Sequence, residues 1–233
     1  MTDLRDFIKL MDGVVARTGY RHADILESLL DYIIGFCSLN PEPNPNWRLN
    51  KEQTRDIHEL FKCLLMILDR KLCAGGWYDI FGDIFMEYAG SKKVMGQCFT
   101  PTCVCDLMSQ MTIPDDCSKS STTFCNGFGY KVAISDPTCG SGRLLLSAAT
   151  RLRSRGRRDI YLIGEDLSLT CCKQTAVNIM LHGFYGEVVC HDTLMEPKEV
   201  RTGFIINEGL YPIPAGLPTI RIVNDKTKFV STR

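Results

Sequence analysis

The chain has 233 residues, of which 45% are hydrophobic, a length sufficient to bury a substantial core. Its 27 lysines and arginines equal its 27 aspartates and glutamates, so no global field attracts a polyanion, and nucleic-acid binding would depend on a local patch or a partner subunit. The longest apolar runs are far too short to cross a bilayer, and the acidic N-terminus lacks the order of a signal peptide, which predicts a cytoplasmic protein.

Residues 1 to about 90 have the periodicity of α-helices. Apolar residues recur at spacings of three and four over 22–39 and again over 54–72, and the proline-rich stretch 41–47 separates the two runs. A third, aromatic-rich segment, 75–90, begins with two glycines. We therefore predict a helical N-terminal domain over residues 1–92.

Residues 93–233 change to short β-rich runs. After a connector in which Pro101 is expected to begin a helix at its first turn, the runs KVAISD (131–136), IYLIGED (160–166) and EVVCHD (187–192) alternate with helical segments. This alternation is typical of βαβ units around a parallel sheet.

A glycine-rich turn, DPTCGSG (136–142), joins the first of these strands to the next helix. Its glycines let the backbone approach a ligand closely, and the helix N-terminus offers unpaired N–H groups. The second strand ends in Glu165 and Asp166, and a carboxylate there can accept hydrogen bonds from both ribose hydroxyls of a nucleoside. Asp192 ends the third strand, so three successive strands end in an acid at one sheet edge, which predicts a nucleoside pocket.

The 12 cysteines lie mostly in apolar, helix-like segments, unlike those of a small disulfide-stapled scaffold. The closest pairs, Cys103 with Cys105 and the adjacent Cys171 and Cys172, do not have the spacing of zinc knuckles. We predict buried, reduced thiols that act as small hydrophobic side chains, and no metal site.

The turn does not supply the G-x-G-x-x-G of a dinucleotide-binding fold. DPTCGSGRLLL (136–146) instead resembles the S-adenosylmethionine loop of amino-group DNA methyltransferases. Segment 164–183 resembles the next segment in the modification subunits of type I restriction systems, MGQCFTP (95–101) resembles their preceding cofactor motif, and DIFGDIF (79–85) resembles the end of their helical N-terminal domain. The resemblance, over about residues 75–195, implies an α/β protein in which a helical domain precedes a partial, Rossmann-like class I methyltransferase sheet.

The resemblance also implies a set of cofactor-binding residues, each at a position that matches a family motif. These are Phe99, Thr100, Pro101, Asp136, Thr138, Gly140, Gly142, Asp166, Leu167, Asp192 and Leu194. Asp136 would face the amino group of the methionine, Asp166 would bind the ribose, and Asp192 would accept from the adenine amino group. Alternatively, Asp136 could cap the following helix, and Phe99 or Leu194 could belong to the core.

In this family the fourth strand ends in Asn-Pro-Pro-aromatic, where the asparagine and a proline carbonyl accept from the amino group of a flipped-out adenine and the aromatic side chain stacks on it. Here Asn207 follows an apolar run and Tyr211 is the next aromatic, but 208–210 reads Glu-Gly-Leu in place of the prolines. Asn207 and Tyr211 are therefore the candidate catalytic residues, in a motif that is not intact.

The chain is also shorter than the family's seven-stranded domain requires, with one further candidate strand at 219–223. It could be a fragment of a longer gene product or a reduced relative that keeps the cofactor half. An open sheet edge would then be covered by the chain's own tail or by another chain in a homo- or hetero-oligomer.

Two functions follow from the resemblance. One is an adenine-N6 DNA methyltransferase that uses S-adenosyl-L-methionine and reaches DNA through a partner specificity subunit. The other is a non-catalytic, methyltransferase-like binding or regulatory subunit. A third interpretation is an unrelated nucleotide-binding α/β domain. The basic run 151–158 lies at a helix end, where the helix dipole stabilises cations. We therefore interpret it as a solvated helix terminus rather than a DNA contact.

Overall fold

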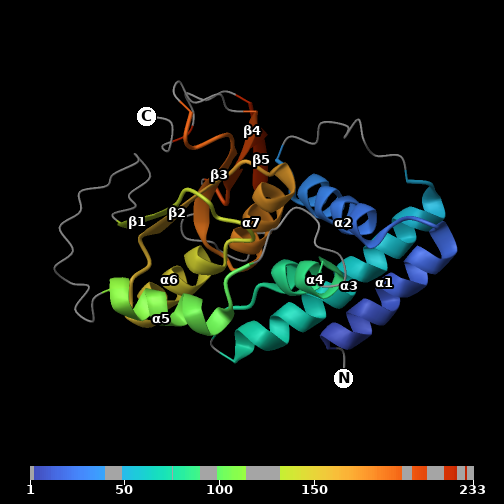
Figure 1. Ribbon diagram of the computed structural model, residues 1–233, viewed down its shortest axis with the longest axis horizontal. Coiled ribbons are helices and arrows are strands. Elements are labelled where there is room, and N and C mark those ends of the chain that lie inside the picture. Colours follow the sequence, from blue (N-terminus) through green and yellow to red (C-terminus); the bar gives the residue numbers. More distant parts are fainter. Residues whose placement is uncertain are drawn as a thin grey trace. The chain divides into compact units, whose positions relative to one another are not determined.

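The computed structural model describes residues 3–39, 49–74, 76–89, 99–113, 132–195, 201–208, 218–224 and 229. The chain divides into two compact units, Met1–Cys98 and Phe99–Arg233 (Figure 1). The domain boundary expected between residues 92 and 93 falls within 90–98, outside the described residues.

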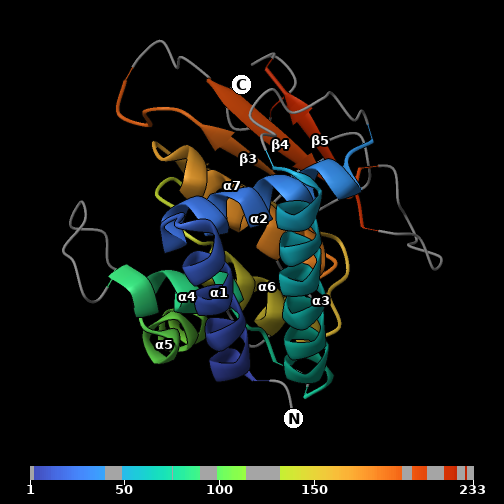
Figure 2. The ribbon, with the colours of Figure 1, turned by 90° about the vertical axis from the view of Figure 1, so that its right-hand side faces the viewer.

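The first unit is helical, as its periodicity predicts. It contains α1 (Leu4–Thr18), α2 (His22–Cys37), α3 (Lys51–Cys73) and α4 (Ile80–Ala89) (Figure 2). The helices bury their apolar faces against one another, and the completely buried side chains include Phe7, Met11, Leu29, Leu30, Leu60, Leu64, Ile80 and Phe81. Helix α1 is capped at its start by Asp3, whose carboxylate accepts from two backbone N–H groups, and at its end by Gly19 in the left-handed conformation.

The second unit is an α/β fold with one five-stranded sheet among the described residues. Its elements are α5 (Thr102–Thr112), β1 (Val132–Asp136), α6 (Arg143–Ser154), β2 (Ile160–Asp166), α7 (Leu169–Leu181), β3 (Tyr185–Cys190), β4 (Thr202–Ile206) and β5 (Ile220–Val223). The strand order is β1-β2-β3-β4-β5.

Strands β1, β2 and β3 are parallel, which confirms the order predicted from their spacing. Each crossover contains a helix, α6 or α7, long enough to return the chain to the start of the next strand. The three carboxyl ends therefore meet at one edge of the sheet.

Strands β4 and β5 are antiparallel to their neighbours, unlike the first three strands. Only residues 191–201 join β3 to β4, and no helix is described among them. A parallel connection needs a dozen or more residues and usually a helix, so the chain turns back beside β3 instead.

Helices α6 and α7 both pack on the sheet, and α5 packs against α6 (Figure 1). Close approach of α7 to β2 depends on Gly164, because a Cβ atom there would lie 3.2 Å from Cys139 Sγ and from Thr175 Cγ2. In the part of the chain that the structure describes, none of the helices combines the length and apolarity needed to cross a membrane.

Candidate functional site

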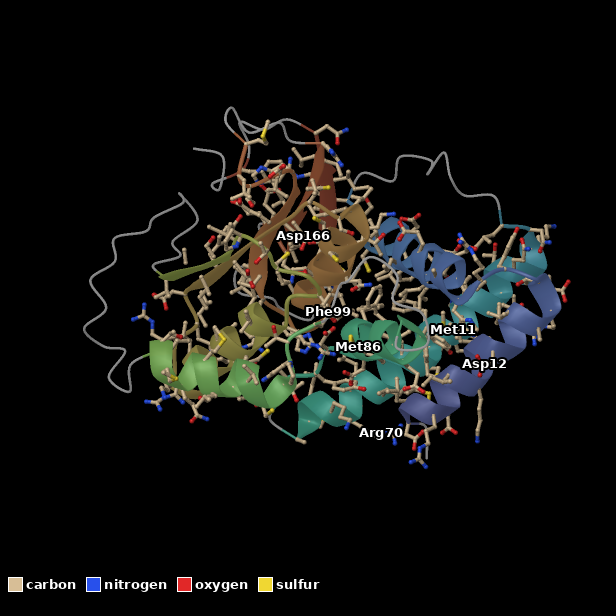
Figure 3. All side chains as sticks on the ribbon, viewed as in Figure 1. Met11, Asp12, Arg70, Met86, Phe99 and Asp166 are labelled. Atoms are coloured by element: carbon tan, nitrogen blue, oxygen red, sulfur yellow. The ribbon has the colours of Figure 1, made fainter. Side chains whose placement is uncertain are left out.

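The predicted acids gather at the carboxyl edge of the parallel strands. Asp136 is the last residue of β1, Asp166 is the last residue of β2, and Asp192 follows the end of β3 by two residues. Figure 3 labels Asp166 together with Phe99, which precedes α5. The edge thus unites residues from four separate segments of the second unit.

The turn after β1 is tied to β2. The N–H of Cys139 donates to the carbonyl of Glu165 over 2.9 Å, and the N–H of Gly140 donates to Asp166 Oδ2 over 3.0 Å. Within the turn, Asp136 Oδ1 accepts from the Thr138 N–H over 3.1 Å. These bonds hold the turn in a shape set by the second strand.

Both glycines of the turn have the left-handed backbone conformation, with φ of 56° at Gly140 and 86° at Gly142. A Cβ atom at Gly140 would lie 3.1 Å from the Phe99 ring, and one at Gly142 would lie 3.1 Å from Thr175 Cγ2. Backbone conformation and close packing therefore both call for glycine at these two positions.

Of the two acidic residues that end β2, Asp166 contacts the turn and Glu165 does not. Asp166 accepts from Gly140 through Oδ2 and from the Ser168 N–H through Oδ1 over 2.8 Å. Glu165 is 5% exposed, and its Oε2 lies 3.1 Å from Nε2 of the fully buried His191. Since successive strand residues point to opposite faces, only Asp166 remains available at the predicted pocket.

One carboxylate oxygen of Asp136 is buried and accepts no hydrogen bond from the described residues. The residue is 9% exposed, and its Oδ2 is buried without a hydrogen-bond partner among the described residues. Burial raises the pKa of Asp136; the Thr138 N–H opposes this rise, and the charge of Asp166 adds to it. A buried carboxylate of this kind would be stabilised by a nearby positive charge.

Asp192 lies beside exposed apolar side chains. Its Oδ1 accepts from the Leu194 N–H over 3.0 Å, and Leu194 is 92% exposed while Leu167 is 54% exposed. Leu169 and Met195, which were not predicted, are also exposed near this edge. A flat apolar ligand that covered these side chains would remove their surface from water.

The Phe99–Pro101 segment reaches the turn from a distant part of the sequence. The ring of Phe99 packs at Gly140, and the Thr100 carbonyl accepts from Arg143 Nη1 over 3.2 Å. Pro101 is the cap residue immediately before α5, one position earlier than the helical first turn predicted for it.

Asn207 does not lie with these residues. It follows β4 and, because β4 runs antiparallel to β3, it lies at the amino end of β3. Its Nδ2 donates to the Phe184 carbonyl over 2.7 Å, its Oδ1 accepts from the Thr219 N–H over 2.9 Å, and the residue is completely buried. The other candidate catalytic residue, Tyr211, lies outside the described residues.

Two polar residues of α7 also support the turn and were not predicted from the sequence. Thr175 Oγ1 donates to the Gly140 carbonyl over 2.8 Å, and Asn178 Nδ2 donates to the Ser141 carbonyl over 2.9 Å. Both residues are 0% exposed. Polar residues three apart on an otherwise apolar helix face were the available sequence signal.

The described cysteines are all free thiols. Cys139, Cys171, Cys172 and Cys190 are buried around the end of β2 and β3, and burial raises the pKa of Cys139 well above its ordinary value. These four agree with the prediction of reduced, hydrophobic thiols, whereas Cys103 is exposed. Among the residues described, no group of three or more histidine, cysteine or acidic side chains could hold a metal ion.

The helical unit has a cavity of about 600 Å³ lined by residues of α1, α3 and α4. Arg5, Arg70, Lys71, Asp83 and Glu87 give it a lining of mixed charge. Arg70 and Lys71 are in the last turn of α3, where the helix dipole stabilises cations. This lining does not select one class of ligand.

Residues 77–207, more than half of the chain, match the model of the N-6 DNA methylase family. The chain therefore belongs to the N-6 DNA methylase family. The matched range contains every predicted cofactor-binding residue and Asn207.

The chain is similar to the type I restriction enzyme MjaVII methylase subunit of Methanocaldococcus jannaschii, with 27% identity over 128 residues, which are 52% of this chain and 20% of that protein. It thus spans about one fifth of the length of this curated relative. A crystal structure of the type I restriction-modification methyltransferase subunit from Streptococcus thermophilus aligns with 82% of this chain and 40% of that chain, at 20% identity and a TM-score of 0.39.

Proposed function

We propose that this chain binds S-adenosyl-L-methionine and S-adenosylhomocysteine at the carboxyl edge of β1, β2 and β3, within a system that methylates adenine N6 in DNA. One observation carries the proposal: within the part of the chain that the structure describes, the buried Oδ2 of Asp136 has no hydrogen-bond partner, and its turn precedes a helix N-terminus. Family membership supports a methyl-donor ligand, and the amino-acid end of that ligand carries an ammonium group.

The residues present fit such a ligand. Asp136 would pair with the ammonium group, and Asp166 would accept from ribose hydroxyls with the lone pairs that Gly140 and Ser168 leave unused. Asp192 would accept from the adenine amino group. Leu167 and Leu194 would cover the adenine ring, which would account for their exposure in the free protein.

When bound, S-adenosylmethionine supplies a methyl group on a positively charged sulfur, and transfer to adenine N6 leaves S-adenosylhomocysteine and a proton. The chain's own part is to hold the ligand. Its backbone amides and carboxylates are fixed by the turn, by β2 and by α7 before any ligand arrives, which lowers the entropic cost of binding.

We further propose that the chain alone holds the cofactor without transferring its methyl group. The amide of Asn207 is fully engaged at the amino end of β3, while the cofactor residues lie at the carboxyl end. The 6 residues of β3 separate these ends by about 20 Å, whereas reacting atoms must approach to about 3–3.5 Å. The DNA and the base-side groups would be supplied through partner chains such as a specificity subunit.

Titration calorimetry with S-adenosylhomocysteine tests the binding proposal. Asp136→Asn keeps the shape of the side chain and removes its charge, and we expect it to weaken binding by about tenfold or more. Asp159→Asn is the matched control, because Asp159 precedes β2 at the opposite sheet edge and pairs with Arg157. No heat from the wild-type chain at millimolar ligand, or equal affinity in the Asp136 variant, would contradict the proposal.

A further inference from the structure

A buried carboxylate and a buried imidazole join the ends of β2 and β3. Oε2 of Glu165 lies 3.1 Å from Nε2 of His191, and the two side chains are 7% and 0% exposed. Because carboxylate oxygens accept hydrogen bonds, the imidazole Nε2–H is the donor in this contact. The pair therefore links the two strands through their side chains, next to the edge where the nucleoside site is proposed.

The orientation of the His191 ring depends on this contact. Among the described residues, its Nδ1 has no hydrogen-bond partner, although the atom is buried. The backbone of His191 is held separately, since its N–H donates to the Asp166 carbonyl over 3.1 Å. His191 thus extends the pairing of β3 with β2 by one residue beyond Cys190, through both its backbone and its side chain.

Asp192 follows His191 directly and is held less firmly than Asp166. The Asp166 carboxylate accepts from the N–H groups of Gly140 and Ser168. In the part of the chain that the structure describes, the Asp192 carboxylate accepts only from the Leu194 N–H, two residues further along the same segment. The position of Asp192 relative to the sheet therefore depends on His191, whereas that of Asp166 is also fixed by the turn.

We propose that the pair of Glu165 and His191 positions Asp192, and that this position lets the site distinguish a 6-amino purine from a 6-oxo purine. The inference rests on the proposed function, in which Asp192 accepts from the adenine amino group. His191 is a positioning residue, because its side chain contacts Glu165, on the opposite side of β2 from the Asp166 carboxylate. An acceptor that is fixed before binding discriminates strongly, since it cannot turn away from an unsuitable ligand group.

The test measures two affinity ratios by titration calorimetry. The base ratio compares S-adenosylhomocysteine with S-inosylhomocysteine, in which a 6-oxo group replaces the 6-amino group. The ribose ratio compares S-adenosylhomocysteine with its 2′-deoxy analogue. Since loss of a hydrogen bond to a charged group changes affinity by about tenfold to hundredfold, the wild-type chain should prefer S-adenosylhomocysteine by about tenfold or more in both comparisons.

Two substitutions of His191 separate positioning from simple destabilisation. His191→Leu removes the link to Glu165 and should lower the base ratio by about tenfold, while the ribose ratio stays within about twofold of its wild-type value. His191→Gln keeps a side-chain N–H that can donate to Glu165, so it should restore most of the base ratio. An equal change in both ratios, or an unchanged base ratio in His191→Leu, would overturn the inference.

Tyr161→Phe is the matched control. The Tyr161 hydroxyl donates to Glu187 Oε2 over 3.1 Å, which makes a second buried side-chain pair between β2 and β3, away from the carboxyl edge. Loss of this hydrogen bond should lower stability and leave both ratios unchanged. A base ratio that fell as far in Tyr161→Phe as in His191→Leu would overturn the inference, because any disturbance of the two strands would then be sufficient.

Histidine-selective ¹⁵N NMR of the wild-type chain tests the pair without any substitution. The geometry requires a proton on Nε2 of His191, and this proton should remain when S-adenosylhomocysteine binds. An unprotonated Nε2, or a wild-type base ratio near one, would overturn the inference even if every variant failed to fold. Binding of S-adenosylhomocysteine with no effect of His191→Leu on the base ratio would leave the proposed function intact. If the wild-type chain bound none of the three ligands, the proposed function itself would fail.

Discussion

The backbone N–H of Gly140 donates to Oδ2 of Asp166 over 3.0 Å, so the turn after β1 and the carboxylate that ends β2 hold each other in place. The bond from Gly140 depends on the left-handed backbone of the turn, and the Ser168 N–H holds the other carboxylate oxygen of Asp166. The ribose site and the amino-acid site proposed above are therefore parts of one rigid structure.

Gly140→Ala tests this coupling. The substitution places a Cβ atom 3.1 Å from the Phe99 ring and imposes a left-handed conformation on alanine, so we expect a loss of about 1–3 kcal/mol in the free energy of unfolding and a weaker ligand affinity. Urea denaturation and calorimetry measure the two effects. Gly156→Ala is the control, because Gly156 has φ of 82° but no atom within 4 Å of its Cβ position, so it should lose stability without losing affinity. Equal affinity losses in both variants would contradict the coupling.

Asn207→Ala should act on stability rather than on ligand binding. The change leaves the Phe184 carbonyl and the Thr219 N–H without their partners, at a cost of about 1–3 kcal/mol for each buried group. Denaturation should show the loss, while calorimetry on the folded variant should give a wild-type affinity for S-adenosylhomocysteine. A variant with full stability that has lost affinity would place Asn207 in the binding site.

Methyl transfer by the chain alone should be absent or very slow. Among the described residues, the amide of Asn207 is engaged away from the proposed cofactor site, and loss of a pre-organised polar contact commonly costs about a hundredfold or more in rate. Tritiated S-adenosylmethionine and adenine-rich duplex DNA provide the measurement. Rapid transfer to adenine that is abolished in Asn207→Ala would refute the proposal that the chain only holds the cofactor.

Stability should fall as the pH drops from about 6.5 to 4 because of His182. Burial lowers the pKa of His182 to about 4, so the unfolded chain binds a proton in this range and the folded chain does not. The histidine contributes full stability above the unfolded pKa, and up to about 3 kcal/mol is lost as the pH falls through the folded value. Denaturation at several pH values should show a smaller slope in His182→Gln.

Asp136 acts in the opposite direction, because a raised carboxyl pKa favours folding as the pH falls, so the comparison depends on the difference between variants rather than on the total slope. An unchanged slope in His182→Gln would contradict the assignment.

The sequence predicts those parts of the fold that depend on local pattern. The helices of the first unit follow from apolar periodicity, and the parallel order of β1, β2 and β3 follows from strand and helix spacing. Asp136, Asp166 and Asp192 could be placed at one edge for the same reason.

Longer-range features could not be predicted in this way. The direction of β4 depends on the short connection after β3, and it sends Asn207 to the far edge although its distance in sequence fits the family motif. The hydrogen bonds from Thr175 and Asn178 to the turn depend on how α7 packs. The sequence shows that these polar residues lie on an apolar helix face, but not which groups they bind. The contact between Glu165 and His191 likewise joins residues from two different parts of the chain, so local sequence does not predict it.

β1 is an outer strand of the sheet, paired only with β2 among the described residues, whereas β2 is paired on both sides. Its residues Val132–Ile134 are partly accessible, while Ile160–Glu165 of β2 are buried. In a hydrogen-exchange experiment β1 is thus expected to open more often than β2. The turn at 136–142 thus joins β1, which is expected to open more often, and is hydrogen-bonded to β2, which is expected to open less often. A ligand that contacted residues at the ends of both strands would slow amide exchange in β1 far more than in β2. The exchange rate of the β1 amides would then report whether the proposed site is occupied.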